Sequence, residues 1–256
     1  LKQFIPWLVE HLPLAESFAC RILRTSGLGE SWVEERLQSL LKDLTDQGLD
    51  IGYCARSGEV DIRFVSMGSQ ANAVVDEACR RTHADLGDLI HSEGNRSLES
   101  ALVEALRQKG MRLALAESCT GGFIAHQVTN VAGASDVFHA GEVSYANQAK
   151  VHLLGVDDKT IDQYGAVSEE TAKAMVEGVL AETEADVALA VTGIAGPSGG
   201  TPEKPVGTVF LGLAGRHETH VFRRLNPYDR ETFKFVTAHQ GMELLRRKVL
   251  GLSLEL

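Results

Sequence analysis

The chain has 256 residues, of which 44% are hydrophobic and 23% charged, and its formal net charge is -10. This composition is that of a folded globular protein and excludes a largely disordered one. The negative charge argues against a nonspecific nucleic-acid binder, and no apolar run is long enough to be a membrane span. Leu1 in place of Met indicates a fragment or a processed chain, without a signal peptide. The cysteines show neither disulfide-framework nor metal-site spacing, so we expect reduced thiols in a cytoplasmic protein.

The first part of the chain predicts a small α+β domain over residues 1–92. In chain order, strand and helix patterns alternate as a strand at 18–23, a helix at 31–44, strands at 51–55 and 60–65 around a hairpin turn at 56–59, and a helix at 71–85. The polar, turn-rich segment 92–97 then separates the two domains, and Ser97 is placed to cap the next helix.

The second part, residues 97–256, predicts a three-layer α/β/α domain. Its patterns are a strand at 111–116, a helix at 123–128, a strand at 141–145, a helix after Ser168, a nearly continuous apolar strand at 185–191, strands at 206–213 and 218–224, and a helix at 229–250. The helix after Ser168 should bury Ala172, Met175, Val176 and Val179.

Ala116-Glu117-Ser118-Cys119-Thr120-Gly121-Gly122 joins the first of these strands to a helix. Such a junction directs unpaired backbone N–H groups and the positive end of the helix dipole at one spot. On its own it indicates only an anion or oxyanion site around Ser118, Thr120, Gly121 and Gly122.

A glycine- and proline-rich loop over residues 192–208 follows the buried strand. Ligands in open α/β sheets lie beyond the carboxyl ends of strands. We therefore expect Thr192, Gly193 and Gly196 to contact a ligand, with Arg230 as a further anion donor.

Tyr145 and Lys150 lie near the junction of the strand at 141–145 and a short helix, so Lys150 and Ser118 are expected at one edge of the sheet. A lysine is a general base for a serine when burial lowers its pKa from about 10.4 towards neutrality. No histidine is then required.

These segments together resemble the C-terminal domain of the CinA family, the nicotinamide-nucleotide amidase domain. The matching segments are residues 116–122, 144–150, 165–168, 192–197 and 204–208. Residues 1–92 resemble the KH-like middle domain of the family, most clearly at 27–31. The molybdopterin-binding-like domain of long family members is absent from this sequence, and with it we expect its pyrophosphatase activity to be absent.

The resemblance implies that nicotinamide mononucleotide is hydrolysed to nicotinic acid mononucleotide and ammonia, with no metal or organic cofactor. Ser118 would attack, Lys150 would move the proton, and Tyr145 would orient or relay. Ser135, in a Gly-x-Ser segment, is a second candidate nucleophile. Cys119 is a third, but no histidine stands in a recognisable partner segment.

Other functions fit the residues less well. Gly27-Leu28-Gly29-Glu30 departs from an RNA-binding KH clamp, so the first domain is interpreted as structural, with a role in forming a homodimer. The loop lacks the ending of a P-loop, which disfavours phosphoryl transfer. A nucleotide-binding or scaffolding module without catalysis, linked to competence or DNA damage, is the alternative from another class.

Overall fold

The computed structural model describes residues 7, 11, 17–56 and 58–255. The start of the predicted small domain and Ser57 of the predicted hairpin turn lie outside the described residues. Contacts within the chain separate two compact units, with the division between Arg96 and Ser97. None of the helices in the described ranges is long and apolar enough to cross a membrane.

The first unit is an antiparallel four-stranded sheet with helices packed on one core, which confirms the α+β prediction. Its elements are β1 (Phe18–Ser26), α2 (Glu30–Leu40), α3 (Lys42–Thr45), β2 (Asp50–Arg56), β3 (Glu59–Met67), α4 (Ala71–Leu86), the 3-10 turn η1 (Gly87–Leu89) and β4 (Ile90–Glu93). The strand order is β2-β3-β1-β4, and the hairpin of β2 and β3 is the predicted one.

Two features of this unit differ from the sequence prediction. The predicted helix over 31–44 is interrupted at Leu41, whose backbone (φ -112°, ψ 11°) leaves the helical region. Leu41 is fully buried, and the bend lets both Leu41 and Leu44 reach the core. Strand β4 was not predicted, and its last two residues overlap the segment 92–97 that was predicted as a linker. Its pairing with β1 is a long-range contact that local pattern does not encode.

The second unit is a mixed five-stranded sheet of order β6-β5-β7-β8-β9. Its elements are α5 (Leu98–Lys109), β5 (Leu113–Glu117), α6 (Phe123–Thr129), the 3-10 turn η2 (Ala134–Asp136), β6 (Phe138–Val143), α7 (Asn147–Leu154), α8 (Asp158–Tyr164), α9 (Glu169–Glu182), β7 (Val187–Gly193), β8 (Thr208–Gly215), β9 (Thr219–Leu225) and α10 (Arg230–Leu250). Helix α8 was not predicted.

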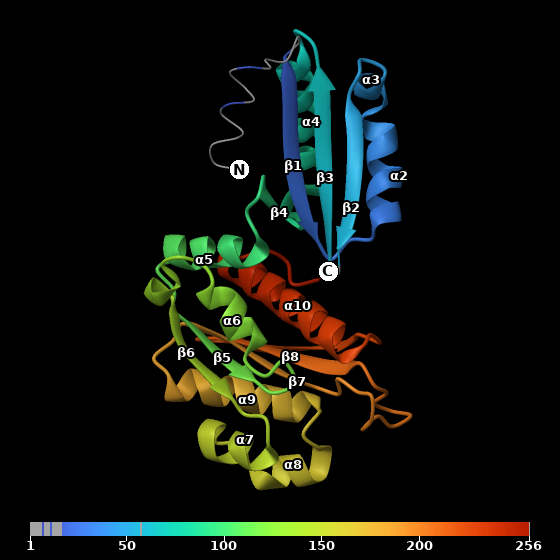
Figure 1. Ribbon diagram of the computed structural model, residues 1–256. Coiled ribbons are helices and arrows are strands. Elements are labelled where there is room, and N and C mark those ends of the chain that lie inside the picture. Colours follow the sequence, from blue (N-terminus) through green and yellow to red (C-terminus); the bar gives the residue numbers. More distant parts are fainter. Residues whose placement is uncertain (1–6, 8–10, 12–16, 57, 256) are drawn as a thin grey trace. The chain divides into compact units, whose positions relative to one another are not determined.

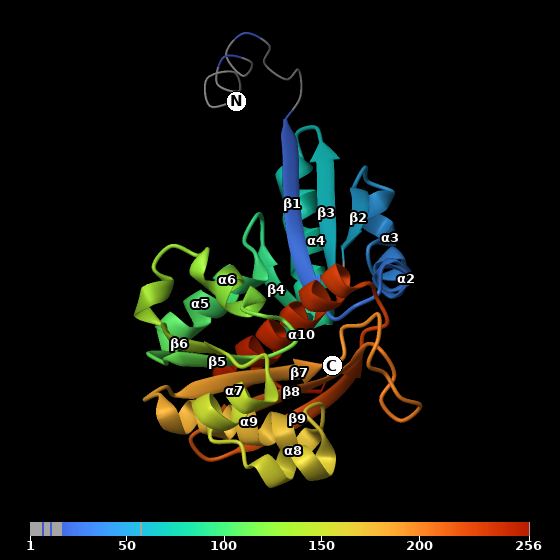
Figure 2. The ribbon, with the colours of Figure 1, turned by 60° about the horizontal axis from the view of Figure 1, so that its bottom comes forward.

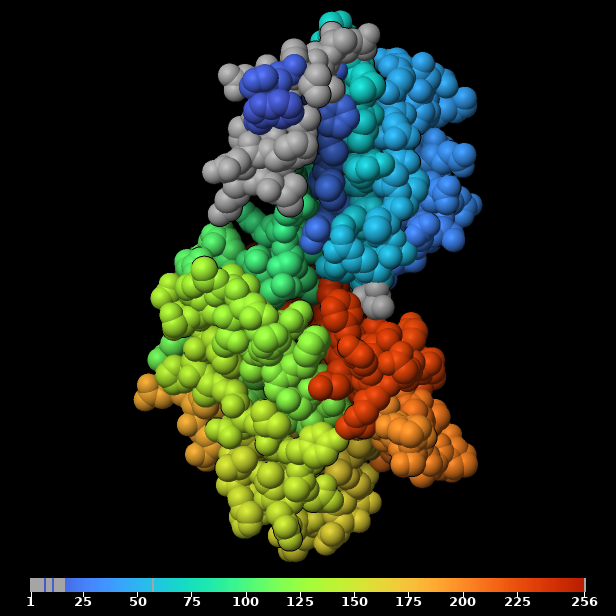
Figure 3. Space-filling model, in the orientation of Figure 1, coloured from blue at the N-terminus to red at the C-terminus, as the bar shows by residue number. Residues whose placement is uncertain are grey.

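Helices cover both faces of this sheet, so the three-layer prediction is confirmed. Figures 1 and 2 show α5, α6 and α10 on one face and α7, α8 and α9 on the other. Successive β5 residues alternate between the two layers: Leu113 and Leu115 pack with the first group, and Ala114 and Ala116 with the second. In the space-filling view the side chains of α7 and α8 form a continuous surface (Figure 3).

Helix α9 follows the sequence prediction closely. The side chain of Ser168 accepts the N–H of Thr171, and the four predicted apolar positions are buried. The helix approaches α7 so closely that a Cβ on Gly178 would lie 1.8 Å from the carbonyl oxygen of Leu154. A glycine at this position therefore allows the two helices to touch.

The strand order reverses direction at β5. After β5 the chain passes through α6 to β6 on one side, and it returns through α7, α8 and α9 to β7 on the other side. All three strands are parallel. Such a switch point opens a crevice at the carboxyl ends of the strands, here just after Glu117 and Gly193.

Candidate active site

The crevice holds a serine and a lysine in direct contact. The Nζ of Lys150 lies 3.0 Å from the Oγ of Ser118, and both side chains are buried. The proximity predicted for these two residues is thus present, although 32 positions separate them in the chain.

Strand pairing places Ser118 directly, and it places Lys150 through the segment that follows β6. The N–H of Ser118 donates to Val191 of β7, and the N–H of Ser144 donates to Glu117 of β5, at 3.0 and 2.9 Å. The ladders thus continue one residue past the ends of β5 and β6. Helix α7 then starts at Asn147 and carries Lys150 back over the end of β5.

Lys150 is surrounded by uncharged acceptors. Its amine contacts the Ser118 hydroxyl and the carbonyl oxygens of Ser144 and Tyr145, at 2.9 and 3.3 Å for the carbonyls. Among the described residues no carboxylate forms an ion pair with it. The side chain is only 1% exposed, and this burial lowers the pKa of Lys150, while neighbouring Cys119 acts weakly in the opposite direction.

The three contacts also orient the amine. Carbonyl oxygens only accept hydrogen bonds, so the two carbonyls hold two N–H bonds of a neutral amine. The remaining direction points at Ser118, where the lone pair of the neutral form then lies. The arrangement suits removal of a proton from the serine hydroxyl.

The amino-terminal end of α6 is not the free anion site that the sequence predicts. The helix starts at Phe123, and its N-terminal N–H groups are occupied by the chain's own Glu117. This 1%-exposed carboxylate accepts from Gly122, Ile124 and Ala125 at 3.0, 3.1 and 2.8 Å. The expected anion site at this helix terminus is therefore filled, because a buried carboxylate needs such donors.

The predicted oxyanion donors change accordingly. The N–H of Gly121 donates to Ser118, and that of Gly122 to Glu117. The N–H groups of Cys119 and Thr120 bond to no backbone oxygen of the described residues; their partner is the sulfur of Cys119, a weak acceptor. Of the predicted donors, Thr120 is fully buried, and like Gly121 and Gly122 it is not among the residues that line the cavity, whereas the neighbouring Cys119 lines it.

A cavity of about 210 Å³ opens beside the serine and the lysine. Its lining comes from five parts of the chain, namely Ser118, Cys119, Tyr145, Asn147, Lys150, Ala166, Val167, Thr192, Gly193, Ala195 and Arg230. The Thr192 hydroxyl donates to the carbonyl of Ala166 at 2.7 Å, which joins β7 to the segment between α8 and α9. At Gly193 a Cβ would lie 2.9 Å from the carbonyl oxygen of Thr208, so close strand packing favours glycine there.

Arg230 and Tyr145 form the outer wall. The guanidinium donates to the Tyr145 hydroxyl at 2.5 Å and to the carbonyl of Gly196 at 3.0 Å. Gly196 has φ +74°, and a Cβ there would lie 2.5 Å from Val206. Arg230 is exposed, and in the described chain it has no carboxylate partner, so its positive charge is available at the mouth of the cavity.

The other candidate nucleophiles are placed differently. Ser135 is exposed in η2, before the amino end of β6, whereas Ser118 follows the carboxyl end of the parallel strand β5. It is not in the cavity lining. Cys119 lines the cavity, but burial raises the pKa of its thiol to about 12, which disfavours the reactive thiolate.

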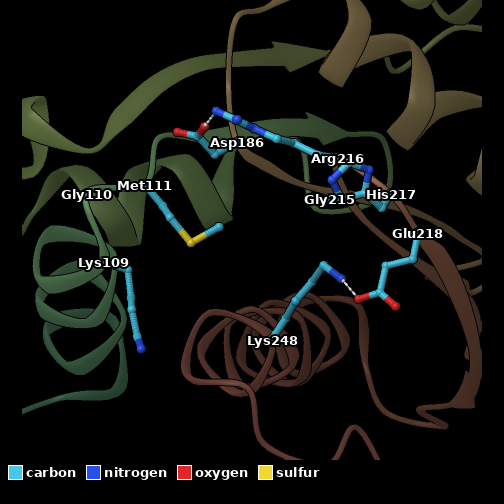
Figure 4. A pocket seen from close by; sticks show the side chains of 9 residues that line it. All are labelled: Lys109, Gly110, Met111, Asp186, Gly215, Arg216, His217, Glu218 and Lys248. Atoms are coloured by element: carbon cyan, nitrogen blue, oxygen red, sulfur yellow. Dashed lines mark hydrogen bonds and ion pairs between the residues drawn. The ribbon is translucent and has the colours of Figure 1, made fainter.

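A larger hollow of about 650 Å³ lies at the opposite end of the sheet, and it contains none of the predicted site residues. Figure 4 shows two ion pairs there, Arg216 with Asp186 and Lys248 with Glu218, and the side chain of Lys109 apart from both. It has no serine beside a base. Chemistry, rather than volume, therefore identifies the smaller cavity as the candidate site.

Sequence reasoning did not assign a role to Glu117 or Asn147. Glu117 belongs to the segment 116–122 that the sequence analysis quoted. An acidic residue close to a helix start is a capping signal, but Glu117 stands five residues before the N-cap, which is an unusual distance for a cap. Asn147 lies in the quoted segment of Lys150 and lines the cavity at the start of α7.

Comparison with known families gives two matches that follow one another along the chain. The sequence pattern of the CinA C-terminal domain matches residues 95–249, and that of the damage-inducible protein CinA KH domain matches residues 20–91. A CinA-like protein of Akkermansia muciniphila is 46% identical over 92% of this chain and 58% of its own length. A CinA-like protein of Dictyoglomus turgidum is 36% identical over 98% and 63%. The chain thus spans about three fifths of these relatives.

Solved structures agree with these matches. The competence/damage inducible protein CihA from Agrobacterium tumefaciens has 40% identity and a TM-score of 0.55, over 58% of this chain and 91% of that one. The competence damage-inducible protein A of Klebsiella pneumoniae has 34% identity and a TM-score of 0.59, over 61% and 97%.

Proposed function

The chain belongs to the CinA family, and we propose that its second unit hydrolyses the carboxamide of nicotinamide mononucleotide to nicotinic acid mononucleotide and ammonia. The observation that carries the proposal is a buried lysine, unpaired with any carboxylate of the described residues, that lies 3.0 Å from a serine hydroxyl lining a cavity. A binding module has no need of an amine whose pKa burial lowers beside a nucleophile.

In the first step the Oγ of Ser118 attacks the carboxamide carbon while its proton passes to the neutral Nζ of Lys150. The carbonyl π electrons move onto oxygen, where the N–H group of Cys119, a residue that lines the cavity, stabilises the negative charge. One such donor typically contributes roughly 3 kcal/mol to transition-state stabilisation. The carbonyl then re-forms, the C–N bond breaks, and Lys150 returns the proton to the leaving nitrogen, which departs as ammonia.

Water completes the reaction. It attacks the ester on Ser118 while Lys150 takes one of its protons. When the second intermediate collapses, Lys150 gives this proton to the departing Ser118 oxygen, and the carboxylic acid product leaves and loses its own proton to water. The same amine serves both steps because it ends each one deprotonated. No further cofactor enters this sequence.

The lining of the cavity suits an elongated substrate with an amide at one end and an anion at the other. Tyr145 spans the distance, since its carbonyl contacts the Lys150 amine and its hydroxyl contacts Arg230. An exposed guanidinium suits a 5′-phosphate. The Tyr145 ring is 58% exposed, and an aromatic face attracts a cation such as the pyridinium ring.

The test is ammonia release from nicotinamide mononucleotide, with nicotinic acid mononucleotide identified as the second product. We expect turnover by the chain and none by Ser118→Ala. Thermal stabilisation by the mononucleotide without any product would instead identify a nucleotide-binding module and refute the proposed hydrolysis.

A further inference from the structure

Glu117 is a buried charge that the proposed reaction does not use. It ends β5, directly before Ser118, and its two carboxylate oxygens hold three N–H groups of the α6 terminus. Helix termini are usually capped by a side chain at the N-cap itself. Here the N-cap is Gly122, which has no side chain and adopts φ +90°. The side chain that caps α6 is therefore that of Glu117, at the other end of the turn.

This contact closes the turn that carries the nucleophile. The backbone of Glu117 is held in the sheet through the N–H of Ser144, and its side chain is held by α6. The segment between these two anchors consists of Ser118, Cys119, Thr120 and Gly121. It therefore contains Ser118, which carries the attacking hydroxyl, and Cys119, and both residues line the cavity.

We propose that Glu117 is a positioning residue, which fixes the turn after β5 and thereby holds Ser118 against Lys150. The inference rests on the proposed hydrolysis at Ser118. Charge-assisted hydrogen bonds to backbone N–H groups are short and directional, so three of them on one carboxylate limit the movement of the turn.

The test is Glu117→Gln, which keeps the size of the side chain but turns an NH2 group towards N–H donors. A displacement of about 1 Å at a reacting atom typically costs on the order of 100-fold in rate. We expect kcat for the mononucleotide to fall between about 10-fold and 100-fold, with KM changed less than about twofold. The pH midpoint of kcat should stay that of the parent protein, because Lys150 remains in place.

The matched control is Asp157→Asn. Asp157 caps α8 by accepting the N–H of Lys159 at 3.0 Å, and it does not line the cavity. This variant should lose stability without losing kcat. If Glu117→Gln resembles it, with a lower unfolding temperature but parental kcat, Glu117 is only structural and the proposal is overturned.

A second measurement tests the role of Glu117 independently of the proposed substrate. A fluorophosphonate forms a P–O bond with the Ser118 oxygen, loses fluoride and passes the serine proton to Lys150. Its labelling rate reports the position of the serine for any substrate, and we expect it to fall at least about 10-fold in the variant. If the parent chain reacts with the probe but not with the mononucleotide, the substrate is wrong and the probe still tests Glu117. Where the Gln variant does not fold, Glu117→Asp, which keeps the charge but shortens the reach, is expected to lower the rate likewise, and an unchanged rate refutes the proposal.

Discussion

Replacing Lys150 by Met tests the base directly, because Met keeps the length of the side chain and removes only the amine. General-base catalysis typically contributes about 10²–10⁴-fold, so kcat should fall by that factor. KM should change little, since the amine bonds to the protein's own oxygens. In the parent protein kcat should rise with pH, with a midpoint below the ordinary lysine value of about 10.4, because burial lowers the pKa of Lys150.

The same variant has a signature in stability. Burial lowers the pKa of Lys150 in the folded state, so in the window between the folded and unfolded pKa the unfolded chain binds more protons. The parent protein therefore gains stability as pH rises through this window, by about 1.4 kcal/mol for each unit of pKa difference. The Lys150→Met variant should not show this increase in stability with pH. It also leaves the carbonyls of Ser144 and Tyr145 without a donor, at a cost of about 1–3 kcal/mol each that does not depend on pH.

The assay is thermal unfolding of both proteins between pH 7 and pH 10, beside the pH profile of kcat. We expect the stability of the parent, measured relative to the variant, to increase with pH. A difference that stays constant across this range, together with a kcat for Lys150→Met within about tenfold of the parent, would refute a neutral buried amine as the base.

Four further substitutions follow from the geometry. Ser135→Ala should keep the parental kcat, since this exposed serine is outside the cavity, and a loss of ammonia release would reinstate it as a nucleophile. Cys119→Ala should also keep activity, and the parent should react slowly with iodoacetamide at pH 8, because burial raises the thiol pKa to about 12. Arg230→Gln should raise KM at least about tenfold for the mononucleotide but not for the riboside that lacks the phosphate; equal effects on both would exclude a phosphate contact. Gly178→Ala should destabilise the protein by about 1–3 kcal/mol in urea unfolding, because its Cβ would lie 1.8 Å from the Leu154 oxygen.

Much of the second unit follows from local pattern. Helix α9 has its cap and its apolar face written in consecutive residues, and the apolar run of β7 indicates a strand covered on both sides. Both are determined by neighbours in the chain, so the sequence suffices. The resemblance to a family likewise singled out Ser118, Lys150 and Tyr145 from short motifs.

Local pattern failed where long-range pairing or packing determines the structure. Helix α8 is only Asp158–Tyr164, too short for a clear period, and β4 exists because β1 offers it a partner. The choice between Ser118 and Ser135 depends on the parallel register of β5 and β6, which puts the two hydroxyls at opposite ends of the sheet.

Glu117 shows, for a single side chain, the difference between what local sequence pattern predicts and what tertiary packing determines. The sequence shows an acidic residue in a glycine-containing turn, and from it alone a free helix terminus was predicted. Only the folded chain decides that its carboxylate turns back onto Gly122, Ile124 and Ala125, because a buried charge must find donors wherever the surrounding backbone offers them. Motif and composition thus determined which residue types meet at the end of β5, and tertiary packing decided which of their polar groups remain free for a ligand.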